Sequence, residues 1–78
     1  MSRPCLWMVI PCYNEEEVLP ITAPLFLEEL QELIQKNKIA ENSKILFIDD
    51  GSWDATWQII SRLAEKNVHF YGIQQSRN

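Results

Sequence analysis

Two short polar segments carry the residues of this sequence that could do chemistry. Each follows a run of apolar residues: Pro11-Cys-Tyr-Asn-Glu15 closes the first run, and Asp49-Asp-Gly-Ser-Trp-Asp54 follows the second. Together they offer an aromatic ring, amide and carboxylate acceptors, and a glycine turn. If the two apolar runs are neighbouring parallel strands, both segments lie beyond the carboxyl ends of the strands, where ligands bind in open parallel sheets.

The chemistry that these segments favour is recognition of a nucleoside. Carboxylates accept hydrogen bonds from ring N–H groups and from ribose hydroxyls, but they repel phosphate unless a cation lies between them. The chain contains only two glycines, Gly51 and Gly72, so a Walker loop and a GxGxxG dinucleotide fingerprint are both excluded. A bound nucleotide would therefore be held by its base and ribose.

Simpler interpretations exist for the same residues. Asp-Gly is a common turn pair, so Asp49 and Asp50 could do no more than end a strand and open a turn. Asp54 could simply begin the next helix. Trp53 and Trp57, spaced i and i+4, favour shielding the helix start and packing on the sheet over stacking on a base. The feature that favours binding is that acidic clusters follow two strands of one unit.

Three apolar runs predict the strands that position these segments. They are Cys5–Ile10, closed by Pro11, then Lys44–Ile48 and Val68–Ile73. Continuous hydrophobicity is typical of strands in a parallel sheet. The order strand, helix, strand, helix, strand predicts an α/β fold with right-handed crossovers and helices packed on the faces of the sheet. Such a unit is half of a doubly wound, Rossmann-like fold, with an unpaired edge and an uncovered face.

The first connecting helix is predicted to reach about Asn37. Its inner stripe is Phe26, Leu27, Leu30, Leu33 and Ile34. The carboxylates of Glu15–Glu17 would complement the positive end of the helix dipole, or form no more than a solvated helix start. Pro20 and Pro24 cannot both be initial in one straight helix. Either the helix kinks near Pro24, or a short turn at Glu16–Leu19 precedes a main helix capped by Thr22, which we favour.

The second connecting helix is predicted to reach about Lys66. Ser52 or Asp54 can cap it by accepting hydrogen bonds from its free backbone N–H groups. Its inner stripe is Trp57, Ile60, Leu63 and Ala64.

Composition excludes several classes of protein. The chain has 78 residues, a formal net charge of -4 and 46% hydrophobic residues, which fits one small domain and not a disordered segment. A pI near 4.8 argues against nucleic-acid and anionic-membrane partners. No apolar run approaches the ~20 residues that span a bilayer, and acidic residues interrupt any secretory signal. We therefore expect a cytoplasmic location.

The cysteines and the histidine predict no metal site. Cys5 and Cys12 lack zinc-ligand spacing and are expected to be reduced thiols in or beside a buried strand, pointing to opposite faces. His69 is the only histidine, and we expect it to be a strand residue and not a ligand or catalytic base.

Taken together, the two polar segments resemble the opening of the family-two glycosyltransferases with a GT-A fold. The resemblance rests on Val9-Ile-Pro-Cys-Tyr-Asn-Glu15 followed by Phe47-Ile-Asp-Asp-Gly-Ser-Trp-Asp-Ala-Thr56. The ending Ser76-Arg-Asn78 is similar to a segment of members that transfer sugars to polyprenyl or dolichyl phosphate. Bactoprenol glucosyltransferases and dolichol-phosphate mannosyltransferases are the most similar in appearance, and the resemblance covers essentially the whole chain.

The resemblance implies a set of nucleotide-binding residues: Pro11, Tyr13, Glu15, Ile48, Asp49 and Asp50. The first three would line the base and ribose, Ile48 and Asp50 would contact the nucleoside, and Asp49 would support them. Ser52, Asp54 and Thr56 match the structural turn and helix start of the family and are not assigned as ligands.

The resemblance also implies a larger enzyme. The DxD segment of the family, which holds Mg²⁺ or Mn²⁺ under the diphosphate, is not among these 78 residues. We therefore expect residues 1–78 to be one N-terminal nucleotide-binding part, truncated before that segment, with no catalytic residue and no bound metal of its own. The whole enzyme would be inverting, with a UDP- or GDP-sugar donor and a polyprenyl phosphate as candidate acceptor, at the cytoplasmic face of the membrane.

Two other interpretations compete with this one. A non-catalytic α/β fragment could associate with itself through the edge and face of its incomplete sheet. A receiver domain of the response-regulator type also ends its strands in acidic residues. It is disfavoured because Tyr13-Asn14-Glu15 and Trp53 do not resemble its acidic pocket, and no later strand supplies the expected lysine.

Overall fold

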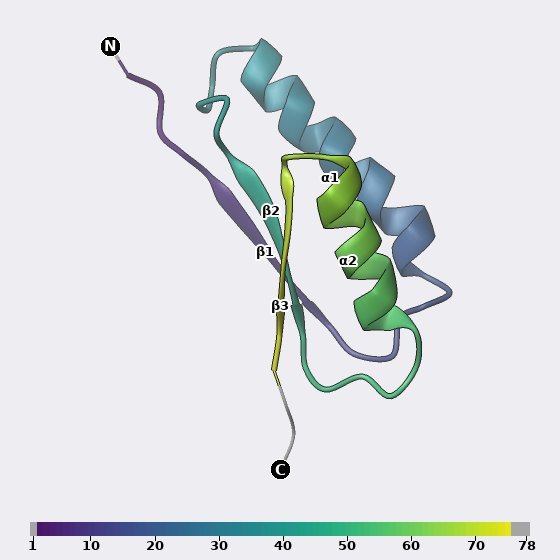
Figure 1. Cartoon of the computed structure of the whole chain (residues 1–78). Helices are drawn as coiled ribbons and strands as arrows, with labels where there is room; N and C mark the ends of the chain where they lie inside the picture. Colours follow the sequence, from purple (N-terminus) through teal and green to yellow (C-terminus); the bar gives the residue numbers. More distant parts are fainter. Residues whose placement is uncertain (1, 76–78) are drawn as a thin grey trace.

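The computed structural model describes residues 2–75 as one parallel sheet with two helices (Figure 1). The strands are β1 (Trp7–Cys12), β2 (Lys44–Asp49) and β3 (Phe70–Gln74). Helix α1 (Leu19–Gln35) connects the first two strands, and α2 (Thr56–Lys66) connects the last two. The predicted α/β class and the β-α-β-α-β order are confirmed. The ending Ser76-Arg-Asn78 lies outside the described residues.

Both helices cover the same face of the sheet. The strand order is β1-β2-β3 with parallel pairing throughout, so two right-handed crossovers advance in one direction and leave both helices on one side. Figure 1 shows α1 and α2 on the same side of the three strands. We call this side the covered face and the other side the open face. An uncovered face is also what the sequence predicts for this half-fold.

The core lies between the covered face and the helices. The buried apolar side chains are Cys12, Leu19, Ala23, Leu30, Ile39, Ile45, Phe47, Ile60 and Phe70. The rings of Phe47 and Phe70 lie 5.6 Å apart between their centroids. The predicted inner stripes are confirmed, because Leu30 and Ile60 are fully buried and the other large apolar members of both stripes pack around them.

The open face is also apolar, but it is exposed. Val9 is 54% exposed and Tyr71 is 52% exposed, and Trp7 and Ile73 are exposed beside them. Trp7 and Tyr71 make an edge-to-face contact with 5.8 Å between ring centroids. Because residues alternate between the faces of a strand, every second residue of each strand belongs to this face.

The strand boundaries differ from the predicted ones: β2 ends one residue later, at Asp49 in place of Ile48, and β1 and β3 differ more. β1 continues through Pro11 to Cys12, where the sequence predicts an end at Ile10. The reason is that β1 is an edge strand, where a missing N–H group costs the sheet no ladder hydrogen bond. β3 begins at Phe70 because Val68 and His69 form a turn after α2, so His69 is not a strand residue.

Helix α1 differs from the favoured prediction at its start. A turn does occur at residues 16–18, where the Glu15 carbonyl accepts hydrogen bonds from the N–H groups of Val18 and Leu19. The prediction of a main helix capped by Thr22 is wrong, because one helix begins at Leu19 and continues through Pro24. Both Pro20 and Pro24 are exposed, so water can replace the hydrogen bond that Pro24 cannot donate.

The end of α1 is a Schellman motif. Lys38 N–H donates to the Leu33 carbonyl at 2.9 Å, and Asn37 N–H donates to the Ile34 carbonyl at 3.0 Å. Asn37 adopts a left-handed conformation with φ of 60°, which terminates the helix two residues before the predicted end. Within residues 2–75, neither helix is both long and apolar enough to cross a membrane.

Candidate functional site

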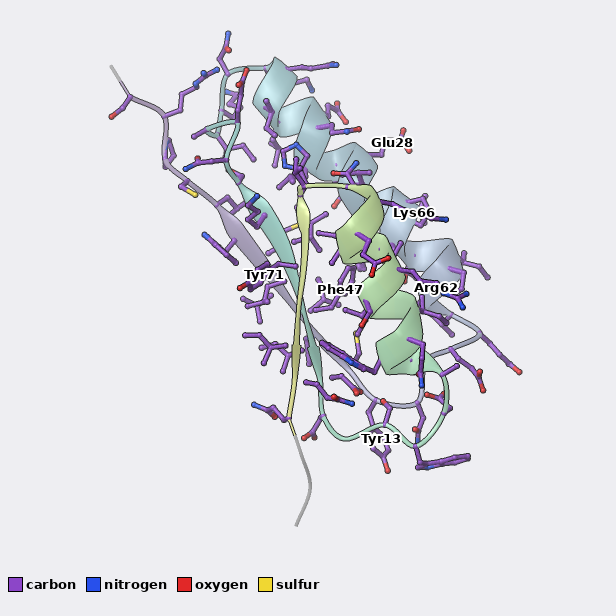
Figure 2. All side chains as sticks on the ribbon, viewed as in Figure 1. Tyr13, Glu28, Phe47, Arg62, Lys66 and Tyr71 are labelled. Atoms are coloured by element: carbon purple, nitrogen blue, oxygen red, sulfur yellow. The ribbon has the colours of Figure 1, made fainter. Side chains whose placement is uncertain are left out.

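The carboxyl ends of β1 and β2 meet in one rim, as the sequence predicts. The β1–α1 loop is residues 13–18, and the β2–α2 loop is residues 50–55. Asp50 N–H donates to the Cys12 carbonyl at 2.9 Å, which holds the two strand ends together. Figure 2 shows Tyr13 at this end of the molecule, beside both loops.

Asn14 and the β2–α2 loop form a reciprocal pair of hydrogen bonds. The Asn14 N–H donates to Ser52 Oγ at 2.8 Å, and the Trp53 N–H donates to Asn14 Oδ1 at 3.0 Å. Asn14 has a φ of 49°, in the left-handed region that asparagine tolerates better than most residues. The pair therefore fixes a sharp bend directly after Tyr13.

Two further backbone groups of the β1–α1 loop bind side chains at the start of α2. Glu15 N–H donates to Thr56 Oγ1 at 2.8 Å, and Glu16 N–H donates to Asp54 Oδ2 at 3.3 Å. Thr56 in turn donates to Asp54 Oδ1 through both its hydroxyl and its N–H group. Burial raises the pKa of Asp54, but the hydrogen bonds from Thr56 and Glu16 outweigh it and hold that pKa below its usual value.

These contacts settle the structural roles of the helix-start residues. Asp54 accepts from the N–H group of Thr56, the first residue of α2, but the N-cap position is Ala55, so neither predicted cap occupies it. Ser52, the other predicted cap, uses its hydroxyl to accept from Asn14. The turn between Asp50 and Ser52 is sharp because Gly51 has a φ of 75°, which favours glycine.

Asp49 and Cys12 lie side by side under the rim, on the covered face. Asp49 is fully buried; its Oδ1 accepts from Ser52 N–H at 3.1 Å, while its buried Oδ2 has no hydrogen-bond partner among the described residues. Burial, the charge of Glu15 with a hydrogen bond to it, and the charge of Asp49 raise the pKa of the Cys12 thiol to about 12. Cys12 is therefore protonated at neutral pH and is not a nucleophile. Neither cysteine forms a disulfide: Cys12 is buried and Cys5 is exposed.

The predicted nucleotide-binding residues occupy three settings. Pro11 and Ile48 are register partners at the end of the open face. Tyr13 and Asp50 each come two residues later, after the buried pair Cys12 and Asp49, and have exposed side chains. Glu15 is half-buried and lines a groove of about 290 Å³ with residues 14–18, Trp53 and Asp54. Asp49 lies beneath the rim. The structure thus brings the first four together and sets Glu15 and Asp49 apart from them.

The charged side chains of both loops are all acidic. They are Glu15, Glu16, Glu17, Asp50 and Asp54, and no lysine or arginine occurs in residues 13–18 or 50–55. Such a rim attracts hydrogen-bond donors and repels phosphate oxygens. No three His, Cys, Asp or Glu side chains within residues 2–75 are arranged to hold a metal ion.

Two residues differ from their predicted roles or escaped prediction. Trp53 is 81% exposed, so the prediction that it packs over the helix start is wrong, whereas Trp57 does pack, against Gly72 of β3. The Asn14 amide was expected only as an acceptor for a ligand, and its role in joining the two loops was not predicted. Its signal would have been a short amide at a position where the chain must turn between a strand and a helix.

A family profile and individual relatives agree on the family that this chain is similar to. The profile described as Glycosyl transferase family 2 matches residues 7–78. The uncharacterized glycosyltransferase YkoT of Bacillus subtilis (strain 168) is 44% identical over 77 residues, which are 99% of this chain and 23% of the relative. The prophage bactoprenol glucosyl transferase homolog of Escherichia coli (strain K12) is 35% identical over 71 residues, 91% of this chain and 21% of the relative.

A third relative has dolichyl phosphate in its name. The dolichyl-phosphate beta-glucosyltransferase ALG5D of Trichomonas vaginalis (strain ATCC PRA-98 / G3) is 30% identical over 73 residues, 90% of this chain and 21% of the relative. The chain thus spans between a fifth and a quarter of the length of these curated relatives. No solved structure gives a significant match.

Proposed function

The chain belongs to glycosyl transferase family 2, and on that premise we propose that residues 1–78 are the nucleotide-binding part of a sugar-transferring catalytic domain. The proposed binding residues are Pro11, Tyr13, Glu15, Ile48, Asp49 and Asp50. The observation that carries the proposal is the 2.9 Å hydrogen bond from Asp50 N–H to the Cys12 carbonyl. It joins the two strand ends, so that Tyr13 and Asp50 flank one rim.

The chemistry of the rim supports a nucleoside as the bound group. The exposed Asp50 carboxylate can accept from a ring N–H or from ribose hydroxyls. Pro11 and Ile48 offer an apolar surface beside it, and the ring of Tyr13 offers an aromatic face on which a base can stack. The acidic rim disfavours a pocket that holds phosphate directly, so the diphosphate would lie away from these loops.

For the whole enzyme, we propose an inverting transfer from a UDP- or GDP-sugar. Inversion means one direct displacement at the anomeric carbon, with the nucleoside diphosphate as leaving group. Bound Mg²⁺ or Mn²⁺ would neutralise that leaving group in such an enzyme. The described residues do not fit such an ion, so no metal ligand is assigned among them and the displacement itself is not assigned to this part.

The proposed acceptor is a polyprenyl phosphate. The support is that relatives of this chain are named as bactoprenol glucosyl transferases and as a dolichyl-phosphate glucosyltransferase. A nucleotide sugar and a lipid phosphate would meet at the cytoplasmic face of a membrane, which is the location that we propose for the whole enzyme.

A nucleotide titration of this chain tests the proposal. UDP, GDP, CDP and dTDP are added separately, with and without Mg²⁺, while backbone amide and Trp indole NMR signals are recorded. We expect saturable shifts at Tyr13, Glu15 and Asp50 with one nucleotide. Asp50→Asn should weaken that binding about tenfold or more, because a charge-assisted hydrogen bond is replaced by a weaker neutral one.

Glu28→Gln is the matched control, since Glu28 is an exposed acid on the outer side of α1 (Figure 2). It removes the same charge far from the rim and should leave the affinity unchanged. A dispersed spectrum that no nucleotide moves would overturn the proposal. So would an Asp50→Asn variant that binds as tightly as the wild type.

A second candidate function is self-association without catalysis. The observation that favours it is the open face, where Trp7, Val9, Tyr71 and Ile73 are exposed together. Sedimentation velocity over a wide concentration range tests it, with a sedimentation coefficient that rises with concentration as the expected result. A monomer at every concentration would exclude this candidate.

A further inference from the structure

Resting on the proposed function, we propose that Thr56 is a positioning residue for the nucleotide pocket. Its hydroxyl would set the affinity for the nucleotide through the β1–α1 loop, without touching the ligand. Thr56 is fully buried at the start of α2, and its Oγ1 accepts from Glu15 N–H at 2.8 Å. Glu15 and the nearby Tyr13 belong to the proposed pocket.

The orientation of the Thr56 hydroxyl is fixed from the other side. A hydroxyl has one proton to donate, and Thr56 donates it to Asp54 Oδ1, an acceptor that cannot donate in return when ionised. The oxygen of Thr56 is then left to accept from Glu15. Asp54 therefore orients Thr56, and Thr56 in turn anchors the backbone of Glu15.

The residues on both sides of Tyr13 are also held by hydrogen bonds to the β2–α2 loop. The Cys12 carbonyl accepts from Asp50 N–H, and Asn14 N–H donates to Ser52 Oγ at 2.8 Å. Tyr13 thus lies between two anchored backbone groups, with the Glu15 anchor next along the chain. The direction of the Tyr13 side chain is consequently set by residues 50–56, which lie in another part of the sequence.

A purely structural role for Thr56 makes a different prediction. If Thr56 only fills space at the start of α2, its substitution lowers the free energy of unfolding but leaves the affinity of the folded protein unchanged. Thr56→Val and Thr56→Ser separate the two roles. Valine keeps the branched shape and removes the acceptor, whereas serine keeps the acceptor and removes a methyl group.

The test is the dissociation constant of the nucleotide that the wild type binds, measured by the NMR titration on the folded form of each variant. We expect about tenfold weaker binding for Thr56→Val and less than a twofold change for Thr56→Ser. In the protein without nucleotide, the amide proton of Glu15 should also shift upfield in Thr56→Val, because its hydrogen bond is lost.

Ser52→Ala provides a second variant at a half-exposed position, in case Thr56→Val does not fold. It removes the acceptor for Asn14 N–H and should also weaken binding severalfold. Equal affinities for the wild type and the folded variants would overturn this inference and leave the proposed function intact. A wild type that binds no nucleotide would overturn both.

Discussion

The two faces of the sheet are built from the same three strands and are both mostly apolar, yet they have opposite surroundings. On the covered face, Ile45 and Phe47 are fully buried under the helices. On the open face, Val9 and Tyr71 are more than half exposed. Figure 2 shows Phe47 between the sheet and the helices and Tyr71 on the opposite side. Hydrophobicity along a strand therefore shows that its faces are suited to burial, while topology decides which face is buried.

Successive residues also differ in burial at the rim, where β2 ends. Asp49 ends β2 on the covered side and is fully buried, whereas Asp50, the next residue, is exposed. Two adjacent and chemically identical side chains thus have different environments. Asp49 accepts from Ser52 N–H within the turn, whereas the side chain of Asp50 is exposed to solvent.

The largest expected effect is loss of an aromatic ring from the covered face. Phe47→Ala should lower the free energy of unfolding by about 3–5 kcal/mol, because a fully buried ring that packs on Phe70 is removed and a cavity remains. Urea denaturation measures the change. Tyr71→Ala, on the open face, is the matched control and should cost under about 1.5 kcal/mol. Similar losses for both variants would break the distinction between the faces.

A methyl group added to the covered side of β3 should have an intermediate effect. A Cβ atom at Gly72 would lie 2.4 Å from Ile60 Cγ2 and 3.3 Å from Trp57 Cζ3. Ile60 is fully buried and cannot move freely, so Gly72→Ala should cost about 1–3 kcal/mol in thermal or urea unfolding. Ile73→Ala, at the next position on the open face, should cost less. A neutral Gly72→Ala would mean that α2 packs less closely on β3 than described.

The smallest expected effect is a polar replacement on the open face. Val9→Thr keeps the branched shape that suits a strand and exposes a hydroxyl where Val9 is already 54% exposed. The free energy of unfolding should change by less than about 0.5 kcal/mol. A loss above about 1 kcal/mol would indicate that Val9 is buried in solution, as expected if a second copy covers the open face.

The sequence predicted the elements better than their boundaries. Apolar runs and helical stripes located every strand and helix, because burial is what such patterns report. The patterns say less about which strands and helices lie next to one another in the fold. Pro11 is part of β1 because β1 is an edge strand, a property of the strand order. Pro24 is accommodated within α1 because it lies on the exposed side of the helix. Local helix propensity alone does not predict which side of the helix a residue occupies.

The candidate site at the rim was also predicted only in part. Its two segments and their juxtaposition follow from the rule that parallel strands point their carboxyl ends to one edge. The hydrogen bonds that join them depend on side-chain rotamers and on the left-handed bend at Asn14, which spacing does not specify. Trp53 illustrates the limit, because its helical spacing from Trp57 suggested packing, while α2 begins only at Thr56 and leaves Trp53 in a loop.

The strand order also has a kinetic consequence. Trp7 pairs with Lys44 across the first crossover, and Ile45 pairs with Phe70 across the second, which is the shorter of the two. Loop closure costs more entropy as the loop lengthens, so we expect β2, α2 and β3 to associate early during folding and β1 to join afterwards. The rim between β1 and β2 is then completed in the last step, and any nucleotide that binds there selects only chains that have finished folding.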